Sequence, residues 1–419
     1  MQRRTCFIVG GITGVVILTA IIVTVVVLVV EKNEENTNSN GCSIYPFEHA
    51  WSPFVVISGT SDFLYPLPGE NVLRFDSQQS VDVLCPGRNI LLNNINSNQS
   101  VLSGYCLENN TFVINKAQID WPNMDCTNYP WRTARYTGAT CENNGLDIEI
   151  GFDTGDNRFL RSMSICFDPV LQVAHYTFIN QTASINQRAL NTPRPSWLQG
   201  SGFYDIGTVT NLYLRANQRR TINSLIGLNE TSTLFIEDDT NYFLSRGHQT
   251  ARSDGFYPAQ QNATFFMMNI APQWQTFNGF NWNQIEIDVR DYAEDNAVDL
   301  WVWTGVYGVA TLPHQETGEP VELYLYVNST ENRKALPVPE VYWKVAYNPI
   351  TERGVALIGV NNPYYQTYTP LCNDISDQLT WLKTKNSDQE QGFCYACSVD
   401  TFRRVVTSMP NISVSGILL

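Results

Sequence analysis

Hydrophobic and polar positions along this chain of 419 residues fall into several patterns, each typical of a different element. The first is an apolar run without charged residues over 7–30, "FIVGGITGVVILTAIIVTVVVLVV", which is long enough to cross a bilayer as a helix. The segment 31–41 that follows is polar and without apolar periodicity, which is typical of a stalk. Arg3 and Arg4 precede the run, so we expect residues 1–6 to lie in the cytosol and the rest of the chain outside.

The apolar run therefore predicts a single-pass type II membrane protein, held in the lipid bilayer by a transmembrane signal-anchor. The alternative is a long signal peptide whose cleavage leaves a secreted protein, although no A-x-A-like cleavage site follows the run. Both interpretations export the body of the chain. Seven N-x-S/T sequons agree with export and predict N-glycans; they begin at Asn98, Asn109, Asn180, Asn229, Asn262, Asn328 and Asn411.

The cysteines also indicate an exported protein. Nine of the ten lie beyond the apolar run, which predicts disulfide bonds and leaves one cysteine free or paired between chains. Zinc is the competing interpretation of Cys394-Tyr-Ala-Cys397, but no second C-x-x-C or nearby histidine completes such a site.

Shorter patterns divide the exported part in two. Residues 42–150 hold five cysteines and many short apolar runs broken by Asn, Gly and Pro, which predicts a small, disulfide-rich and mostly-β module. Residues 151–419 have a different pattern of apolar residues. Apolar runs predict strands over 173–179, 233–236, 300–306, 341–347 and 354–360.

Two helices are predicted in the second part. Apolar residues three and four apart indicate one helix over 282–295, and a second is expected over 399–409 with Ser398 as its N-cap. Strands interspersed with a few helices are typical of an α+β domain.

The charge balance limits the function. The chain carries 40 acidic and 26 basic residues, a formal net charge of −14, which argues against simple electrostatic adhesion to nucleic acid or to an anionic membrane. A polyanionic substrate would need a local basic cleft or a bound cation.

Candidate chemistry is concentrated between residues 246 and 290. His248 follows Arg246-Gly247, a short buried strand is expected over 265–268, and Asn269 lies at its end. Pro272 is expected to force a turn, because proline lacks an N–H and restrains the residue before it. The helix then carries Glu286, with Asn278 eight residues earlier.

These are the groups that phosphodiester hydrolysis requires. A neutral histidine can take a proton from water, oxygen ligands suit Mg²⁺, and arginines complement phosphate oxygens. Taken singly, each has an ordinary explanation: a loop histidine is usually polar surface, Asn269 could cap a turn, and Glu286 with Arg290 could be an exposed helical pair. Their order and spacing favour a site.

That order resembles the DNA/RNA non-specific endonuclease family, the ββα-metal nucleases that include endonuclease G. The density of aromatic residues in this sequence is most similar to that of the extracellular arthropod branch. The resemblance covers roughly residues 170–410. It rests on Arg246-Gly247-His248, Asn269-Ile-Ala-Pro-Gln273, Asn278 with Trp282, and Glu286 with Arg290. It implies a nuclease domain over 151–419 whose central antiparallel sheet is flanked by helices.

By position, the resemblance implies the role of each residue. His248 would be the general base, and Asn269 the direct ligand of a hydrated Mg²⁺, with Mn²⁺ as the alternative ion. Glu286 would hold metal-bound water. Arg246 and Arg194 would contact the phosphate during catalysis, and Asn278 and Arg290 would also bind substrate.

The implied activity is sugar-non-specific cleavage of DNA and RNA, including double strands, to 5′-phosphate products. One departure concerns the position before Arg246, where the family commonly has aspartate and this chain has Ser245. The alternative function is a weak or inactive nuclease fold that binds extracellular nucleic acid. The sequence does not distinguish a DNA from an RNA preference.

Overall fold

The structure is a computed structural model that describes residues 41–384 and 388–419. The predicted membrane helix over 7–30, the cytosolic tail and nearly all of the predicted stalk lie outside these residues. Among the described residues, no helix is long and apolar enough to cross a bilayer.

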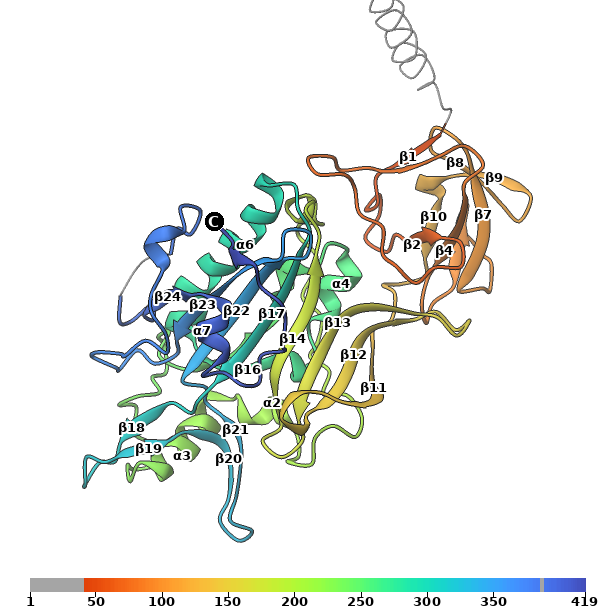
Figure 1. Cartoon of the computed structure of the whole chain (residues 1–419). Helices are drawn as coiled ribbons and strands as arrows, with labels where there is room; N and C mark the ends of the chain where they lie inside the picture. Colours follow the sequence, from red (N-terminus) through yellow and green to blue (C-terminus); the bar gives the residue numbers. More distant parts are fainter. Residues whose placement is uncertain (1–40, 385–387) are drawn as a thin grey trace, which may run out of the picture.

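The first part of the chain folds as a small β module (Figure 1). Two disulfides, Cys42–Cys106 and Cys85–Cys126, cross-link it. Its five-stranded sheet contains β2 (Phe54–Ile57), β4 (Ser80–Leu84), β7 (Val101–Glu108), β8 (Thr111–Ile114) and β9 (Ala117–Asp120). Two smaller sheets pair β1 (Cys42–Ile44) with β3 (Leu73–Phe75), and β5 (Ile90–Leu92) with β6 (Ile95–Asn96) and β10 (Met124–Cys126). These features agree with the disulfide-rich, mostly-β module that the sequence predicts.

A nine-stranded sheet forms the centre of the second part. Its strands are β11 (Thr133–Thr140), β12 (Leu146–Asp153), β13 (Phe159–Asp168), β14 (Val173–Gln181), β17 (Leu300–Tyr307), β22 (Val341–Asn348), β23 (Arg353–Val360) and β24 (Cys394–Cys397), in that order, with β25 (Gly416–Ile417) beside β23. Neighbours are antiparallel except β23 and β25. The expected domain boundary between residues 150 and 151 therefore falls inside β12, and we place it in the linker 127–132 instead.

Most of the elements expected in this part are present. Strands β14, β17, β22 and β23 match predicted strands, and α6 (Asn281–Asp295) matches the predicted helix. Residues 233–236 form no strand. The helix expected over 399–409 is shorter, α7 (Val399–Arg403), although the Thr401 N–H does donate to Ser398 Oγ at 3.3 Å. The strand expected over 265–268 is wrong, because residues 267–269 form a 3₁₀ turn.

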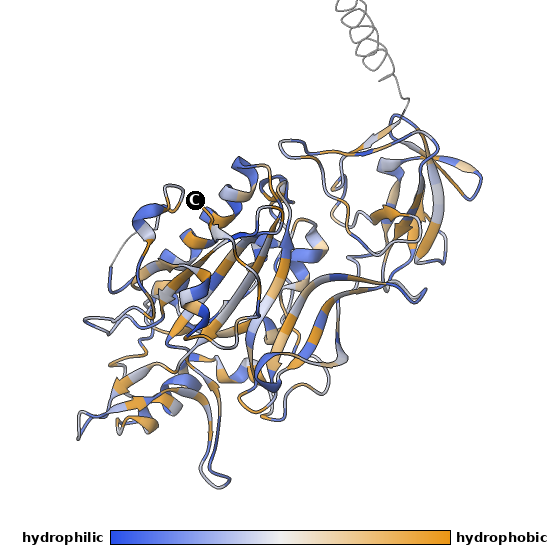
Figure 2. Ribbon diagram, in the orientation of Figure 1, coloured by the Kyte–Doolittle hydropathy of each residue, from blue (hydrophilic) through white to orange (hydrophobic). Residues whose placement is uncertain are grey.

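Helices cover both faces of the sheet (Figure 1). Trp282, Ile285 and Val289 of α6 belong to the core that also holds Val302 and Ala346 of the sheet. The neighbouring residue Val345 points to the other face and packs in the core under α7. Figure 2 shows the hydrophobic residues recurring along the strands, as a two-sided buried sheet requires.

The remaining cysteines also pair as expected of an exported chain. Cys141 bonds to Cys166, and Cys372 bonds to Cys397, so the C-x-x-C motif contributes one cysteine to a disulfide. Cys394 is the one free cysteine in the described part of the chain.

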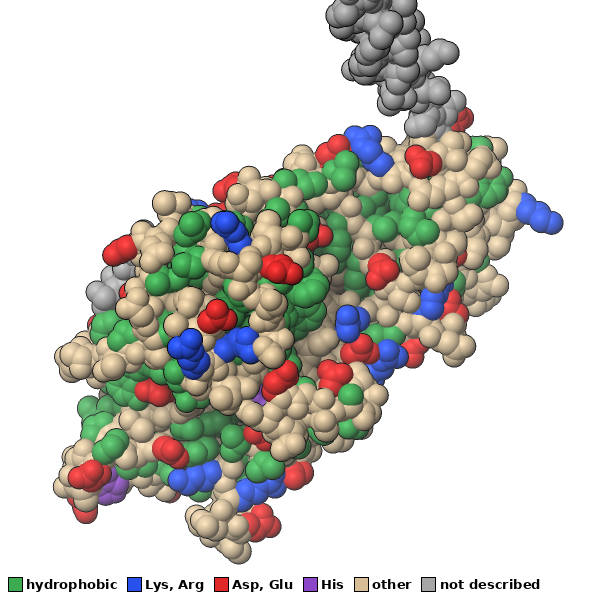
Figure 3. Space-filling model, viewed as in Figure 1, with side chains coloured by type: hydrophobic (Ala, Val, Ile, Leu, Met, Phe, Trp, Pro, Cys, Tyr) green, Lys and Arg blue, Asp and Glu red, His purple; other side chains and the backbone are tan. Residues whose placement is uncertain are grey.

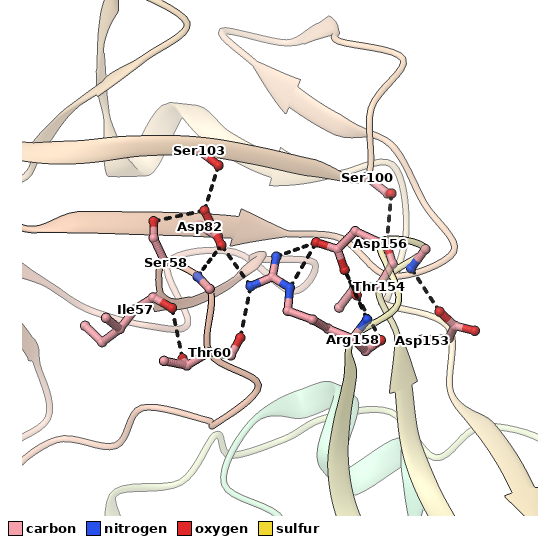
Figure 4. Close-up of polar contacts among 12 residues, drawn as sticks. Ile57, Ser58, Thr60, Asp82, Ser100, Ser103, Asp153, Thr154, Asp156 and Arg158 are labelled. Carbon is pink, nitrogen blue, oxygen red and sulfur yellow. Dashed lines mark hydrogen bonds and ion pairs between the residues drawn. The ribbon is translucent and has the colours of Figure 1, made fainter.

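The module is fixed against the large sheet by a buried ion pair (Figure 4). Arg158, in the turn between β12 and β13, donates from Nη1 to Asp82 Oδ2 on β4 at 2.8 Å and to the Thr60 carbonyl at 2.9 Å. Burial alone would raise the pKa of Asp82, but hydrogen bonds from Ser103, Gly59, Ser58 and Arg158 outweigh it and lower the pKa.

Apolar contacts strengthen the same junction. The Phe54 ring of the module lies 4.9 Å from the Phe152 ring of β12 and 5.4 Å from the Tyr257 ring, measured between centroids. The module and the second part thus share one core.

Candidate active site

The segment that begins with the Arg246-Gly247-His248 motif forms a strand–strand–helix unit. Strand β15 (Leu244–His248) pairs antiparallel with β16 (Ile270–Trp274), then α5 (Gln275–Asn278) leads into α6. The turn expected at Pro272 is wrong: Pro272 lies within β16, opposite Arg246. A two-stranded ribbon accommodates it because its unpaired edge needs no N–H there.

Gly247 is explained by close packing in this unit. A Cβ atom at Gly247 would lie 2.4 Å from Gln273 Cβ and 2.6 Å from the Tyr342 hydroxyl, so no side chain fits. Tyr342 also donates to the Ala271 carbonyl at 2.8 Å, which fixes the ribbon on β22. Gly247 thus lets the strand that carries Arg246 and His248 pack tightly against the sheet.

His248 is half-buried between two aromatic rings. Its ring centroid lies 5.0 Å from that of Trp197 and 5.2 Å from that of Phe265. Nε2 is buried and has no hydrogen-bond partner. Nδ1 is therefore the ring nitrogen left to meet water.

The surroundings keep His248 neutral. Its pKa is lowered to about 3, mainly by burial and in addition by the positive charges of Arg194 and Arg252, while Asp254 opposes the shift. The ring is therefore unprotonated, as a general base requires, throughout the neutral range.

Arg246 lies on the same face of β15 as His248, two residues away. Its guanidinium carbon lies 5.4 Å from the Tyr213 ring centroid and 5.9 Å from that of Trp197, and Nη2 donates to the Thr210 carbonyl at 3.2 Å. Nε is buried without a partner. Trp197 thus lies against both Arg246 and His248, and the guanidinium keeps donors that the described residues do not use.

Asn269 is placed differently from its predicted role as metal ligand. It is fully buried, its Oδ1 accepts from the Thr250 N–H at 2.9 Å, and its Nδ2 donates to the Thr250 and Thr264 carbonyls, both at 2.9 Å. With its amide engaged and its surface covered, Asn269 holds the loop after His248 and offers nothing to a hydrated cation.

Asn278 differs from Asn269 in its burial and in the partners of its amide. It is half-buried at the end of α5, and its Nδ2 donates to Ser245 Oγ at 3.1 Å. Ser245 Oγ in turn donates to the Gln273 carbonyl at 2.8 Å. This chain of bonds fixes the carboxamide and leaves Oδ1 with no donor among the described residues. Ser245, where the family commonly has aspartate, therefore orients Asn278.

Glu286 and Arg290 lie in a cluster of four charges at the sheet. Arg290 is 4% exposed, and its Nη1 donates to Asp254 at 2.7 Å. Lys344 Nζ lies 3.8 Å from Asp254. The expected contact between Arg290 and substrate is therefore wrong, since its guanidinium is buried in an ion pair.

Glu286 remains half-buried beside this cluster. Burial raises its pKa to about 7, with Asp254 adding to the rise and Arg290 and Lys344 opposing it. Asp254 thus lies close enough to affect the pKa of both Glu286 and His248.

Sequence comparison identifies the family. The profile of the DNA/RNA non-specific endonuclease family matches residues 143–402, more than half of the chain. The chain belongs to this family.

Two salivary proteins are among those similar in sequence to this chain. The chain is 27% identical over 273 residues to the salivary endonuclease of Lutzomyia longipalpis, an alignment that covers 64% of this chain and 62% of that protein. It is 21% identical over 299 residues to the salivary protein Tsal1 of Glossina morsitans morsitans, covering 70% and 72%. Among solved structures, the EndoG/EndoGI complex matches with a TM-score of 0.38 and 17% identity over 61% of this chain and 87% of that chain.

The family motif does not contain every residue that surrounds His248. Arg194 is exposed and, like Arg252, close enough to affect the pKa of His248. Arg252 and Trp197 were missed by the sequence analysis, although Trp197 follows Arg194 closely in the same proline-flanked segment. Asp254 and Lys344 were also missed, because no local pattern links them to α6.

Proposed function

We propose that the protein is a metal-dependent endonuclease that hydrolyses phosphodiester bonds of DNA and RNA, single- or double-stranded, to 5′-phosphate products. The observation that carries the proposal is a neutral histidine with one open nitrogen, on the same ββα unit as a half-buried carboxylate. Membership of the nuclease family supports it.

His248 acts as the general base in this proposal. Its Nδ1 takes a proton from the attacking water, while Trp197 and Phe265 hold the ring and exclude water from the Nε2 side. The low pKa makes His248 a weak base, so it needs help from neighbouring groups in stabilising the charge that develops on the phosphate.

The donor set fits a hard divalent cation such as Mg²⁺ or Mn²⁺, because the available groups of Asn278 and Glu286 are both oxygens. We assign the direct contact to Asn278 and not to Asn269, whose amide is fully engaged. Glu286 would hold water bound to the cation. Such a cation would supply Lewis-acid stabilisation of the phosphate and the leaving oxygen.

Arginines complete the proposed site. Arg246 makes one hydrogen bond through Nη2 and forms no ion pair within the described ranges, and Arg194 is exposed and close enough to lower the pKa of His248. Guanidinium groups bind phosphate oxygens bidentately and offset charge that grows in the transition state. A few arginines and a cation thereby reconcile an acidic chain with a polyanionic substrate.

We further propose that the protein works outside the cytosol, as a type II membrane protein held by residues 7–30 or as a secreted protein after cleavage. Four disulfides support this location. Alkaline carbonate extraction separates the two forms: anchored protein stays with the membranes, and a soluble form that starts near residues 31–42 would overturn the anchor.

The nuclease proposal is tested by incubating the purified protein with plasmid DNA and with double-stranded RNA, with and without EDTA. We expect cleavage of both with Mg²⁺ and none with EDTA. Binding of both nucleic acids without cleavage under any divalent metal would support the alternative, a nuclease fold that only captures nucleic acid.

A further inference from the structure

Trp131 is a large exposed aromatic residue in the linker between the module and the large sheet. It is 47% exposed. Its backbone N–H donates to the Pro86 carbonyl at 2.7 Å, and a Cβ at Gly87 would lie 2.7 Å from Trp131 Cβ. Gly87, at φ +63°, thus lets the indole stand directly on the module, which holds the ring in place and leaves part of it open.

Two arginines lie near the Trp131 ring. The guanidinium carbon of Arg88 lies 5.3 Å from the ring centroid and that of Arg132 lies 5.8 Å from it. Arg88 is half-buried at the rim, while Arg132 is only 9% exposed. Aromatic rings interleaved with arginines are the usual elements of a surface that binds single-stranded nucleic acid.

Arg132 links Trp131 to the candidate active site. Its Nη2 donates to the Ser196 carbonyl at 2.9 Å, its Nε is buried without a partner, and burial lowers its pKa. Ser196 directly precedes Trp197, whose ring packs on His248. A single side chain therefore connects Trp131 with the segment that covers the general base.

The arginines near Trp131 and His248 are not neutralised by acidic side chains. There are four of them, and none forms an ion pair with a described residue; they are Arg88, Arg132, Arg194 and Arg252. The chain as a whole carries −14, and acidic and basic side chains are interspersed over the face seen in Figure 3. A row of unpaired cations in an acidic protein is suited to an anionic ligand.

A pocket of about 470 Å³ lies beside Trp131, between the module and the β12–β13 hairpin. Arg88, Asn89, Ser100 and Thr154 line it together with Trp131. Its walls are held together by the bond from Ser100 Oγ to the Thr154 carbonyl at 3.3 Å (Figure 4). The volume lies in the range of small-ligand sites.

We propose that Trp131 and Arg88 form an accessory subsite that stacks one base of the substrate strand and holds its phosphate, away from the scissile bond. The inference rests on the proposed nuclease function and names a part of its substrate groove. Asp153 also lines the pocket, so the phosphate lies on the Arg88 side and the base on the indole. Arg132 holds the segment that carries Trp197, and the exposed Arg194 then guides the strand toward His248.

The proposal predicts a length-dependent affinity. The full chain is titrated in EDTA with fluorescent single-stranded oligonucleotides of increasing length. We expect affinity to rise once the strand reaches Trp131, and Trp131→Ala to weaken binding of those longer strands by about tenfold, since stacking of one base typically contributes that much. Trp131→Phe should retain most of the gain. Because the Asn98 sequon lines the same pocket, each protein is measured before and after removal of N-glycans.

Matched controls separate stacking from loss of structure. Trp51→Ala removes another exposed tryptophan of the module (40% exposed), and Arg74→Ala removes an exposed arginine paired with Glu70. Both should bind as the unmodified protein does. Arg88→Ala should lower the slope of log affinity against log salt by about 0.7, the value for one lost single-strand phosphate contact.

Cleavage gives an independent measure. The ratio of kcat/KM for a long oligonucleotide to that for a dinucleotide should fall about tenfold in Trp131→Ala. Unchanged affinity and an unchanged ratio in Trp131→Ala, or an equal loss in Trp51→Ala, would overturn the subsite while leaving the nuclease proposal intact. Absence of any cleavage or binding by the unmodified protein would overturn both.

Discussion

Asn269→Ala should lower the stability of the protein, whereas Asn278→Ala should weaken its use of Mg²⁺. Asn269 makes three hydrogen bonds from a fully buried side chain. Its removal leaves one N–H and two carbonyls without partners, and each buried unsatisfied group costs about 1–3 kcal/mol. The total of about 3–9 kcal/mol is a large part of a typical stability of about 5–15 kcal/mol.

Asn278 is half-buried, and its structural contacts are the donations from Nδ2 to Ser245 and Gln275. Asn278→Ala should therefore cost at most about 1 kcal/mol of stability. In our proposal it removes the direct contact to the cation, so the Mg²⁺ concentration for half-maximal cleavage should rise at least about tenfold. Ser245→Ala, which only frees the Asn278 carboxamide, should give a smaller rise.

Thermal unfolding and Mg²⁺-dependent cleavage, measured on the same preparations, check both parts. Asn269→Ala should lower the melting temperature by at least about 5 °C, or prevent folding, whereas Asn278→Ala should melt near the unmodified protein. A stable Asn269→Ala protein with weakened Mg²⁺ dependence, together with an unaffected Asn278→Ala protein, would refute the reasoning and restore Asn269 as the ligand.

Three further predictions test other parts of the structure. Arg194→Gln removes a positive charge that lowers the pKa of His248, so that pKa should rise and the acidic limb of kcat/KM should move to higher pH; an unmoved limb would contradict the site electrostatics. Arg158→Met removes the cation from Asp82, which keeps its other hydrogen bonds, and should cost about 1.5–3 kcal/mol, seen as a lower melting temperature and faster proteolysis in the linker 127–132. Asn262 is 3% exposed in α4 (Pro258–Ala263), so peptide mass spectrometry should find it unmodified, and a glycan there would contradict the fold.

The sequence predicts those elements whose apolar periodicity matches burial. Helix α6 was recognised because Trp282, Ile285 and Val289 repeat on its buried face. Residues 233–236 carry apolar side chains but form no strand, since Leu234 is 57% exposed and only Ile236 is buried. Strand β11 was missed as part of the large sheet because most of its residues are exposed and polar, as on an edge strand.

The site could be predicted only in part, for a different reason. The family motif located His248, Arg246 and Glu286, but a motif does not show which asparagine has its amide saturated by hydrogen bonds. Asn269 and Asn278 differ in burial and partners, and those depend on Thr250, Thr264 and Ser245 in three dimensions. Trp197 and Lys344 reach the site from distant parts of the chain, and no spacing rule connects them; Arg252 is near His248 in the sequence but lies outside the motif.

The general-base role of His248 is the central claim, and replacement by alanine tests it most directly. His248→Ala should reduce cleavage of plasmid DNA and of RNA by a factor of about 10²–10⁴, while Mg²⁺ binding, substrate binding and the melting temperature stay near those of the unmodified protein. Cleavage of both substrates by His248→Ala at the unmodified rate would contradict the account.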